Sequence, residues 1–221
     1  MAAICVAVLS VAVPAAAQTP AGQTNQANSA PMVSLWYAGV ITGMAAVEEA
    51  GGAFGGEAGA RVWRNFDVSL EGGWFQDTNT KHRSDLAATL ASFIQQREGQ
   101  TATSSVDAPT TYFSANGRWV FENTGRFRPY AMFGIGAARV EIKSTFTLAG
   151  QDITGSLPSY GVTLGSDLSG HSSHLAISAG AGVLIPIGKF YGDVGYRITS
   201  IQTPDQASNV NRLVVAFGAR F

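Results

Sequence analysis

The chain has 221 residues, of which 14 are basic and 15 acidic, so its formal net charge is −1. Charged residues make up 13 % of the chain, about half of the roughly 25 % found in soluble globular domains, while 46 % of the residues are apolar and 26 are glycine. The aromatic content argues against disorder, and a single cysteine excludes a disulfide scaffold. A net charge near zero offers no electrostatic footprint for nucleic acid. The location of the protein must therefore account for the missing charge.

The first residues have the pattern of a secretory signal peptide. Residues 1–13 form an apolar run that is followed by Pro14 and three alanines, and no charged side chain occurs before Glu48. An apolar core that ends at small residues predicts a signal peptide over 1–17, cleaved after Ala17. A buried N-terminal helix is disfavoured because the run is short. The basic residues that usually begin a signal peptide are missing, so a start codon further upstream is an open alternative.

The segment that follows the predicted cleavage site is small and polar. Residues 18–33 are therefore expected to form a flexible leader. Cys5 lies at the beginning of the apolar run and not at its cleavage end, so we do not expect it to carry a lipid. The mature chain would then contain no cysteine, which suits an oxidising compartment.

From residue 34 onward apolar and polar residues alternate with a period of two, which indicates β-strands. Eight segments show or continue this pattern: 34–46, 53–64, 66–77, 110–121, 129–146, 172–187, 190–202 and 210–221. The fifth segment mixes apolar and charged residues on one face, and we expect a β-bulge there. We predict an all-β protein, an eight-stranded antiparallel up-and-down barrel over 34–221.

The connections between these segments alternate in length. The connections 64–65, 122–128 and 188–189 are tight, whereas 78–109 and 147–171 are long. Short turns at one end and long loops at the other are typical of outer-membrane barrels, whose short turns face the periplasm. An even number of strands returns both termini to that side.

Aromatic residues gather near the ends of the strands. The set at the short-turn end comprises Trp36, Tyr37, Trp63, Phe66, Trp119, Phe121, Phe127, Tyr130, Phe190, Tyr191 and Phe221. A thinner set toward the long loops comprises Phe54, Trp74, Phe75, Tyr112, Phe113 and Phe146. Two such sets predict the aromatic girdles of a transmembrane barrel, with Trp36, Trp63, Trp119 and Phe190 as the main members of the first.

Charged residues within the strands indicate which face of the barrel is polar. Those expected to face the lumen are Glu57, Arg61, Asp67, Glu71, Arg118, Arg139, Glu141, Asp193 and Arg197. An eight-stranded barrel is just wide enough for side chains to fill it, so opposite charges can pair there and plug it. The Gly- and Ala-rich apolar face would then contact lipid. The alternative is a soluble calycin-like barrel with its apolar face around a ligand.

The closing segment 212–221 (RLVVAFGARF), the strand opening Arg128-Pro129-Tyr130 and the glycine-rich strands together resemble the small outer-membrane barrels of the OmpA, OmpX and opacity-protein kind. The resemblance implies a place in the outer membrane of a Gram-negative bacterium, with lipid and lipopolysaccharide as partners. It also implies that Phe217 and Phe221 form the signal read by the barrel-assembly machinery. We expect no counterpart of the periplasmic domain of OmpA, since no residues follow Phe221 in this sequence.

The sequence contains little catalytic or metal-binding chemistry. His171 and Ser173 have the H-x-S spacing of a lipid A deacylase that resembles these barrels, but no carboxylate follows at a position suited to orient the histidine. On one strand His171 and His174 would point to opposite faces, which disfavours a shared metal. We therefore expect no enzyme activity, no cofactor and no metal.

The first long loop contains a predicted helix over 84–98. Its apolar residues recur at helical spacing, with Ser84 as N-cap and Asp85 in the first turn. The helix either meets the membrane or a partner, or it caps the barrel mouth. Lys81, His82 and Arg83 could contact lipopolysaccharide phosphates.

These observations predict a monomeric envelope or surface-interaction protein that acts through its long loops, with a surface ligand that the sequence does not specify. A small porin-like channel is the first alternative, and a lipid A acyl-modifying barrel enzyme is the second.

Overall fold

A computed structural model of the chain describes residues 36–221, apart from 49, 122–125 and 204–206. The predicted signal peptide (1–17), the predicted leader (18–33) and the first two residues of the first predicted strand (34–35) lie outside these described residues, and they stay predictions.

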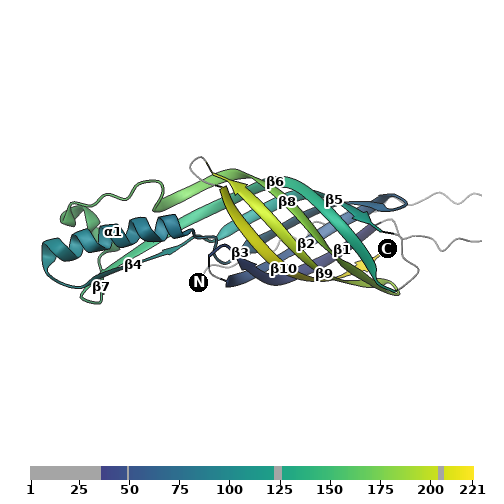
Figure 1. The fold of residues 1–221 in the computed structure, drawn as a ribbon, viewed down its shortest axis with the longest axis horizontal. Coiled ribbons are helices and arrows are strands. Elements are labelled where there is room, and N and C mark those ends of the chain that lie inside the picture. The colour runs from purple at the N-terminus through teal and green to yellow at the C-terminus, as the bar shows by residue number, and fades with distance from the viewer. Residues whose placement is uncertain (1–35, 49, 122–125, 204–206) are drawn as a thin grey trace, which may run out of the picture. The chain divides into compact units, whose positions relative to one another are not determined.

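Within the described residues, eight antiparallel strands form a closed ring (Figure 1). They are β1 (Trp36–Ala46), β2 (Ala50–Trp63), β3 (Phe66–Phe75), β5 (Thr110–Val120), β6 (Arg128–Leu148), β8 (Ser169–Ile187), β9 (Phe190–Gln202) and β10 (Ala207–Arg220). The ring order is β6-β5-β3-β2-β1-β10-β9-β8, and β8 pairs again with β6. This arrangement confirms the predicted up-and-down barrel.

The ring is closed where the first strand meets the last one. β1 pairs with β10 from Tyr37↔Arg220 to Ala46↔Asn211. The backbone N–H of Phe221 donates to the carbonyl of Trp36 at 3.1 Å, and the N–H of Trp36 donates back at 3.3 Å. Closure removes the free sheet edges that would otherwise expose unpaired backbone groups.

The long loops fold into a structure that we call the cap: α1 (Lys81–Glu98), β4 (Ala102–Asp107), β7 (Gln151–Asp152) and the 3-10 helix η1 (Thr154–Tyr160). Figure 1 shows α1, β4 and β7 beyond one end of the barrel. β4 and β7 both pair with the outer part of β6, so this strand carries the sheet from the barrel into the cap. The sequence predicted the helix but not β4.

The predicted start of the helix was three residues too late. α1 begins at Lys81 after the N-cap residue Thr80, and Ser84 lies inside the helix, where its hydroxyl accepts a hydrogen bond from the Asn79 amide at 2.8 Å. Hence neither the Ser84 cap nor an acidic first turn is present. The helix ends at Gly99, whose φ of 68° is left-handed and whose N–H donates to Gln95 O at 2.9 Å.

The predicted β-bulge in the fifth strand is wrong. β6 pairs without a register shift with β5 and with β8, and a shift occurs instead between Arg61 and Trp63 of β2. At 21 residues β6 is about twice the 9–11 residues that span a bilayer. Its charged residues therefore do not need to turn inward, because the outer half of the strand continues past the barrel.

The interior is divided between charges and an apolar core. The apolar core joins the outer end of the barrel to the cap, and it includes Ile94 of α1, Phe146 of β6 and Leu157 of η1. The Phe75 and Tyr112 rings stack within it with their centroids 4.4 Å apart. The same core therefore fixes the cap on the barrel. No helix in the described part of the chain is long and apolar enough to cross a membrane.

Candidate functional site: the barrel lumen and the cap

Charged side chains of both signs meet inside the barrel. Among the described residues, the ion pairs at its centre join three arginines to three acids: Arg118, Arg197 and Arg212 with Glu57, Glu71 and Asp193. Each of these six residues is at most 4 % exposed. Because the charges are equal in number, the lumen holds a neutral network, as a buried set of ions requires.

The network has two centres that share Asp193. At the first, Arg118 Nη2 lies 2.8 Å from Glu57 Oε2 and 3.8 Å from Asp193 Oδ2. At the second, Glu71 receives Arg197 Nη1 at 2.5 Å and Arg212 Nη1 at 2.8 Å. Arg197 Nη2 joins the two centres through Asp193 Oδ2 at 3.2 Å.

These bonds cross the lumen. Glu57 lies on β2 and Glu71 on β3, whereas Arg197 and Asp193 lie on β9 and Arg212 on β10. Strands from different sides of the ring are therefore tied together through its interior, and side chains occupy the path that a solute would take.

Tyrosine hydroxyls complete the network. Tyr191 donates to Glu57 Oε1 at 2.9 Å, Tyr130 donates to Asp193 Oδ2 at 3.0 Å, and Tyr112 donates to Glu71 Oε1 at 2.8 Å. The guanidinium of Arg118 also lies over the Tyr130 ring, 4.8 Å from its centroid. Each acid thus receives a hydroxyl as well as an arginine.

Glycines make room for these rings. A Cβ added to Gly182 or to Gly195 would lie 2.6 Å from the Tyr130 hydroxyl oxygen. Such a distance is shorter than real carbon–oxygen contacts, so an alanine would displace the ring. The high glycine content therefore has a local cause in the close approach of ring and strand.

The predicted lumenal residues fall into three groups. Glu57, Glu71, Arg118, Asp193 and Arg197 meet in the network. Arg61 and Asp67 form a separate pair, with Arg61 Nε 2.7 Å from Asp67 Oδ1.

Arg139 and Glu141 do not belong to the lumen, which corrects that part of the prediction. Both side chains are exposed on the outer face of β6. Glu141 Oε1 lies 3.1 Å from Lys143 Nζ, and both side chains of this pair are more than half exposed. Arg139 pairs with Thr111 near the outer end of the β5 ladder, and Glu141 lies just past the last β5 pair, so both charges stand at the outer edge of the barrel.

Arg212 was missing from the predicted set. Successive side chains of a strand point to opposite faces, and we call this odd–even alternation parity. Because the neighbouring Leu213 is exposed, parity alone could have placed Arg212 inside.

The tyrosines and some phenylalanines were placed in the wrong position. Tyr37, Tyr130 and Tyr191 were expected in the girdle, and Phe75, Tyr112 and Phe146 in the set near the long loops, but all of these rings are buried inside. Position along the strand suggested a girdle, whereas parity decides which face a ring occupies.

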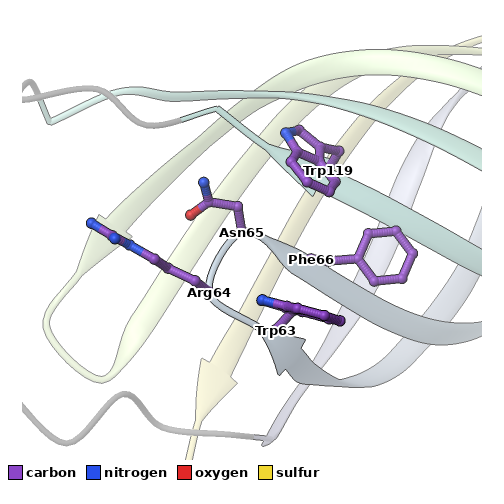
Figure 2. Close-up of a pocket in the computed structure, with 5 residues that line it drawn as sticks. All are labelled: Trp63, Arg64, Asn65, Phe66 and Trp119. Atoms are coloured by element: carbon purple, nitrogen blue, oxygen red, sulfur yellow. The ribbon is translucent and has the colours of Figure 1, made fainter.

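The four principal girdle residues, in contrast, are exposed on the outer face: Trp36, Trp63, Trp119 and Phe190. Figure 2 shows Trp63, Phe66 and Trp119 around a shallow pocket of about 550 Å³ beside the β2–β3 turn. The Phe66 and Trp119 rings lie 6.2 Å apart. Phe217 is also exposed, and its ring stacks on Phe190 at 5.6 Å.

A pocket of about 480 Å³ lies at the cap end of the barrel, lined by the first turn of α1 and the beginnings of β8 and β10. All three histidines of the chain line it. His174 Nε2 and Ser172 Oγ are 2.6 Å apart, whereas Ser173, the predicted partner of His171, is exposed and does not line the pocket. Within the described residues no group of three or more His, Cys, Asp or Glu side chains could hold a metal ion.

A closed antiparallel barrel with an apolar outer wall, exposed tryptophans near one end and neutralised charges inside is a transmembrane barrel of the outer-membrane class. Residues 3–221 match the family described as outer membrane protein beta-barrel domain, and the chain belongs to this family. Its location is therefore the bacterial outer membrane. In outer-membrane barrels as a class, the short turns face the periplasm and the longer loops face outward.

Several solved structures match this chain at low sequence identity. Neisserial surface protein A (NspA) is 13 % identical, with 84 % of this chain and 96 % of that chain covered and a TM-score of 0.54. The N-terminal β-barrel domain of Pseudomonas aeruginosa OprF is 15 % identical (82 % and 96 % covered, TM-score 0.42), and Ail, the attachment invasion locus protein of Yersinia pestis, is 14 % identical (85 % and 97 % covered, TM-score 0.44). No curated protein matches the sequence.

Proposed function

We propose that this protein is a closed outer-membrane anchor that presents the cap to a ligand at the cell surface. The observation that carries the proposal is the lumenal network, in which bonded charges from opposite strands fill the barrel. A barrel filled in this way does not conduct solutes. The side chains that can contact a ligand then lie in the cap.

The packing of the cap supports this role. Ile94, Phe146 and Leu157 are almost fully buried between the helix, the extended strand and η1. A cap held by its own apolar core presents a defined surface, whereas a loose loop would have to be ordered on binding. The exposed Phe93 on α1 adds an apolar contact to this surface.

Catalysis is less well supported than binding. The Ser172–His174 contact is the geometry in which a histidine could accept a proton from a serine. In the described residues, however, no carboxylate is bonded to His174, so nothing orients its ring as catalytic triads require. Replacing Ser172 with alanine, and Ser173 in a second strain, should leave the mass spectrum of lipid A unchanged.

The channel alternative is tested by conductance. The purified chain, inserted into planar bilayers, should show no stable current steps. A variant with Glu57→Ser, Glu71→Ser, Arg118→Ser and Arg212→Ser is the positive control, because it removes four of the six charged side chains of the network while keeping the charge balanced. Steps with the unmodified chain of the same size as with this variant would refute the closed barrel.

Accessibility on intact cells tests the exposed cap. Ser92→Cys places a thiol on the exposed face of α1, and Lys189→Cys places one in the short turn between β8 and β9. A membrane-impermeant maleimide should label position 92 on intact cells and position 189 only after permeabilisation. Labelling in the opposite order would refute the proposed orientation.

A further inference from the structure

The two ends of the barrel differ in charge. Outside the lumenal network, the described residues at the short-turn end include six cations and one acid: Arg61, Arg64, Arg126, Arg128, Lys189, Arg220 and Asp67. In the described part of the cap and the outer strand ends, acids outnumber bases. The network between the two ends is neutral. The small net charge of the chain therefore conceals a strongly basic end.

Three of these arginines lie on the inner face of the barrel wall, and we call Arg61, Arg128 and Arg220 the basic mouth. Each is only partly exposed, and each lies two residues from a buried position on its strand, so by parity its side chain faces inward. The outward-facing side chains at this end are aromatic, as at Trp63 and Phe190. Lipid headgroups therefore meet the girdle, whereas the basic mouth meets molecules that approach along the barrel axis.

The basic mouth lacks the charge balance of the lumen. Arg61 Nε lies 2.7 Å from Asp67 Oδ1, and the Arg61 side chain is 17 % exposed. Within the described residues, Arg128 and Arg220 form no ion pair, and the guanidinium of Arg220 lies over the Tyr191 ring, 5.6 Å from its centroid. The charges of Arg61 and Arg128 lie close enough to repel that of Arg220. An arginine cannot lose its proton in a protein, so a bound anion would relieve this repulsion.

The arrangement of the cations fits several carboxylates on one polymer. A planar guanidinium binds a carboxylate through two parallel hydrogen bonds. Arg126 and Lys189 lie exposed in two other short connections at the same end, and neither forms an ion pair within the described part of the chain. Positive charge therefore extends from the mouth to its rim. A small anion would neutralise one guanidinium, whereas a polymer with many carboxylates can bind at the mouth and the rim together.

We propose that the basic mouth binds the carboxylate-bearing peptides of the cell wall, the polymer on the periplasmic side of the outer membrane. The proposal rests on the orientation proposed above, with the cap outside the cell and the short turns in the periplasm. One end of the barrel then contacts the cell wall, and the other end presents the cap. Anionic lipid headgroups are the competing partner, and the inward direction of the three arginines disfavours them.

The test measures cosedimentation of the full chain, held in nanodiscs of zwitterionic lipid, with purified cell-wall sacculi. Three probes are compared: intact sacculi, sacculi whose carboxylates have been converted to neutral amides, and vesicles that contain anionic phosphatidylglycerol. We expect the chain to pellet with intact sacculi. Half-maximal binding should need about tenfold more of the amidated sacculi, as the loss of one charge-assisted bond predicts.

Two matched double variants separate the basic mouth from general charge effects. Arg128→Gln with Arg220→Gln removes two positive charges from the mouth, and Arg139→Gln with Lys143→Gln removes two from exposed positions near the cap. The first variant should need about tenfold more intact sacculi for half-maximal binding. The second should bind like the unmodified chain. Both should keep heat-modifiable migration on gels, because neither removes a buried ion pair.

Three results would each overturn the proposal. The first is equal pelleting with intact and amidated sacculi. The second is equal loss of binding in the two double variants. The third is pelleting with the anionic vesicles that is lost in the mouth variant while binding to sacculi is not, which would assign the mouth to lipid headgroups. Each of these results can occur with the cap labelled on intact cells and the barrel closed, so it would leave the proposed function standing.

Discussion

Replacing Glu71 with glutamine should destabilise the barrel far more than the same change at Glu141. Glu71 accepts bonds from Arg197, Arg212 and Tyr112, and its side chain is almost completely buried. Glutamine keeps the shape but removes the charge, so two buried guanidinium groups lose a common partner. In the described residues, Arg212 has no other carboxylate in its ion pairs.

The expected magnitudes follow from burial. Breaking a buried ion pair by removing one partner costs about 3–5 kcal/mol. The Glu141–Lys143 pair has side chains that are 54 % and 60 % exposed, and such a pair contributes roughly 0–1 kcal/mol. The free energies of unfolding of Glu71→Gln and Glu141→Gln should therefore differ by at least about 2 kcal/mol.

Equilibrium unfolding in urea, followed by tryptophan fluorescence in lipid vesicles, measures this difference. A double variant Glu71→Gln with Arg212→Met keeps the lumen neutral and should recover part of the lost stability. If the Glu71 and Glu141 variants unfold at the same urea concentration with the same slope, the buried ion pairs of the lumen stabilise the barrel no more than the exposed pair does.

Three further outcomes are expected. Vesicles of lipid brominated in the acyl chains should quench the fluorescence of a variant that retains only Trp119, because this indole lies on the outer wall; emission unaffected by bromine would contradict its lipid contact. Gly195→Ala should destabilise the barrel by about 1–3 kcal/mol in urea unfolding, since its methyl group would lie 2.6 Å from the Tyr130 hydroxyl oxygen, and the same change should cost less in a chain that carries Tyr130→Phe. Gly99→Ala, which puts a side chain at a left-handed φ of 68°, should lower the stability of α1 by about 1 kcal/mol, seen as faster amide exchange in α1 with exchange in β9 unchanged.

The girdle and the lumen show which features of the barrel a sequence pattern can predict and which it cannot. Alternation predicted the strands and turn lengths predicted the orientation of the barrel, because both are local consequences of the backbone. The tyrosines were misplaced because their position along the strand was considered without their parity. Applied strictly, parity would have placed Tyr130 and Arg212 inside.

Arg139 and Glu141 were misplaced because we assumed that every charged residue of a strand faces the lumen, although their parity indicated the outer face. Their alternation with Val140 was plain, and the expected bulge was introduced only to bring them inside. The β5 ladder ends at Val140, and β6 has 21 residues and continues beyond it to pair with β4, so these two charges stand at the outer edge of the barrel and can remain on its outer face. How far a strand continues past the bilayer depends on pairing with a loop segment, and the sequence carries no local signal for such a partner.

The low charge of the chain and its sorting to one face of each strand favoured a barrel with lipid outside, but the sequence left a soluble barrel open. The tertiary structure decided between them, because apolar side chains are exposed on the outer face of every strand of the ring. Only the tertiary structure decided which charges meet. Glu71 and Arg212 lie 141 positions apart, and ring order and register bring them within 2.8 Å. The pocket is a similar case, since His82 and His174 come from different loops and face one space only after the cap folds. Alternation is a property of neighbouring residues, whereas a site depends on closure of the ring.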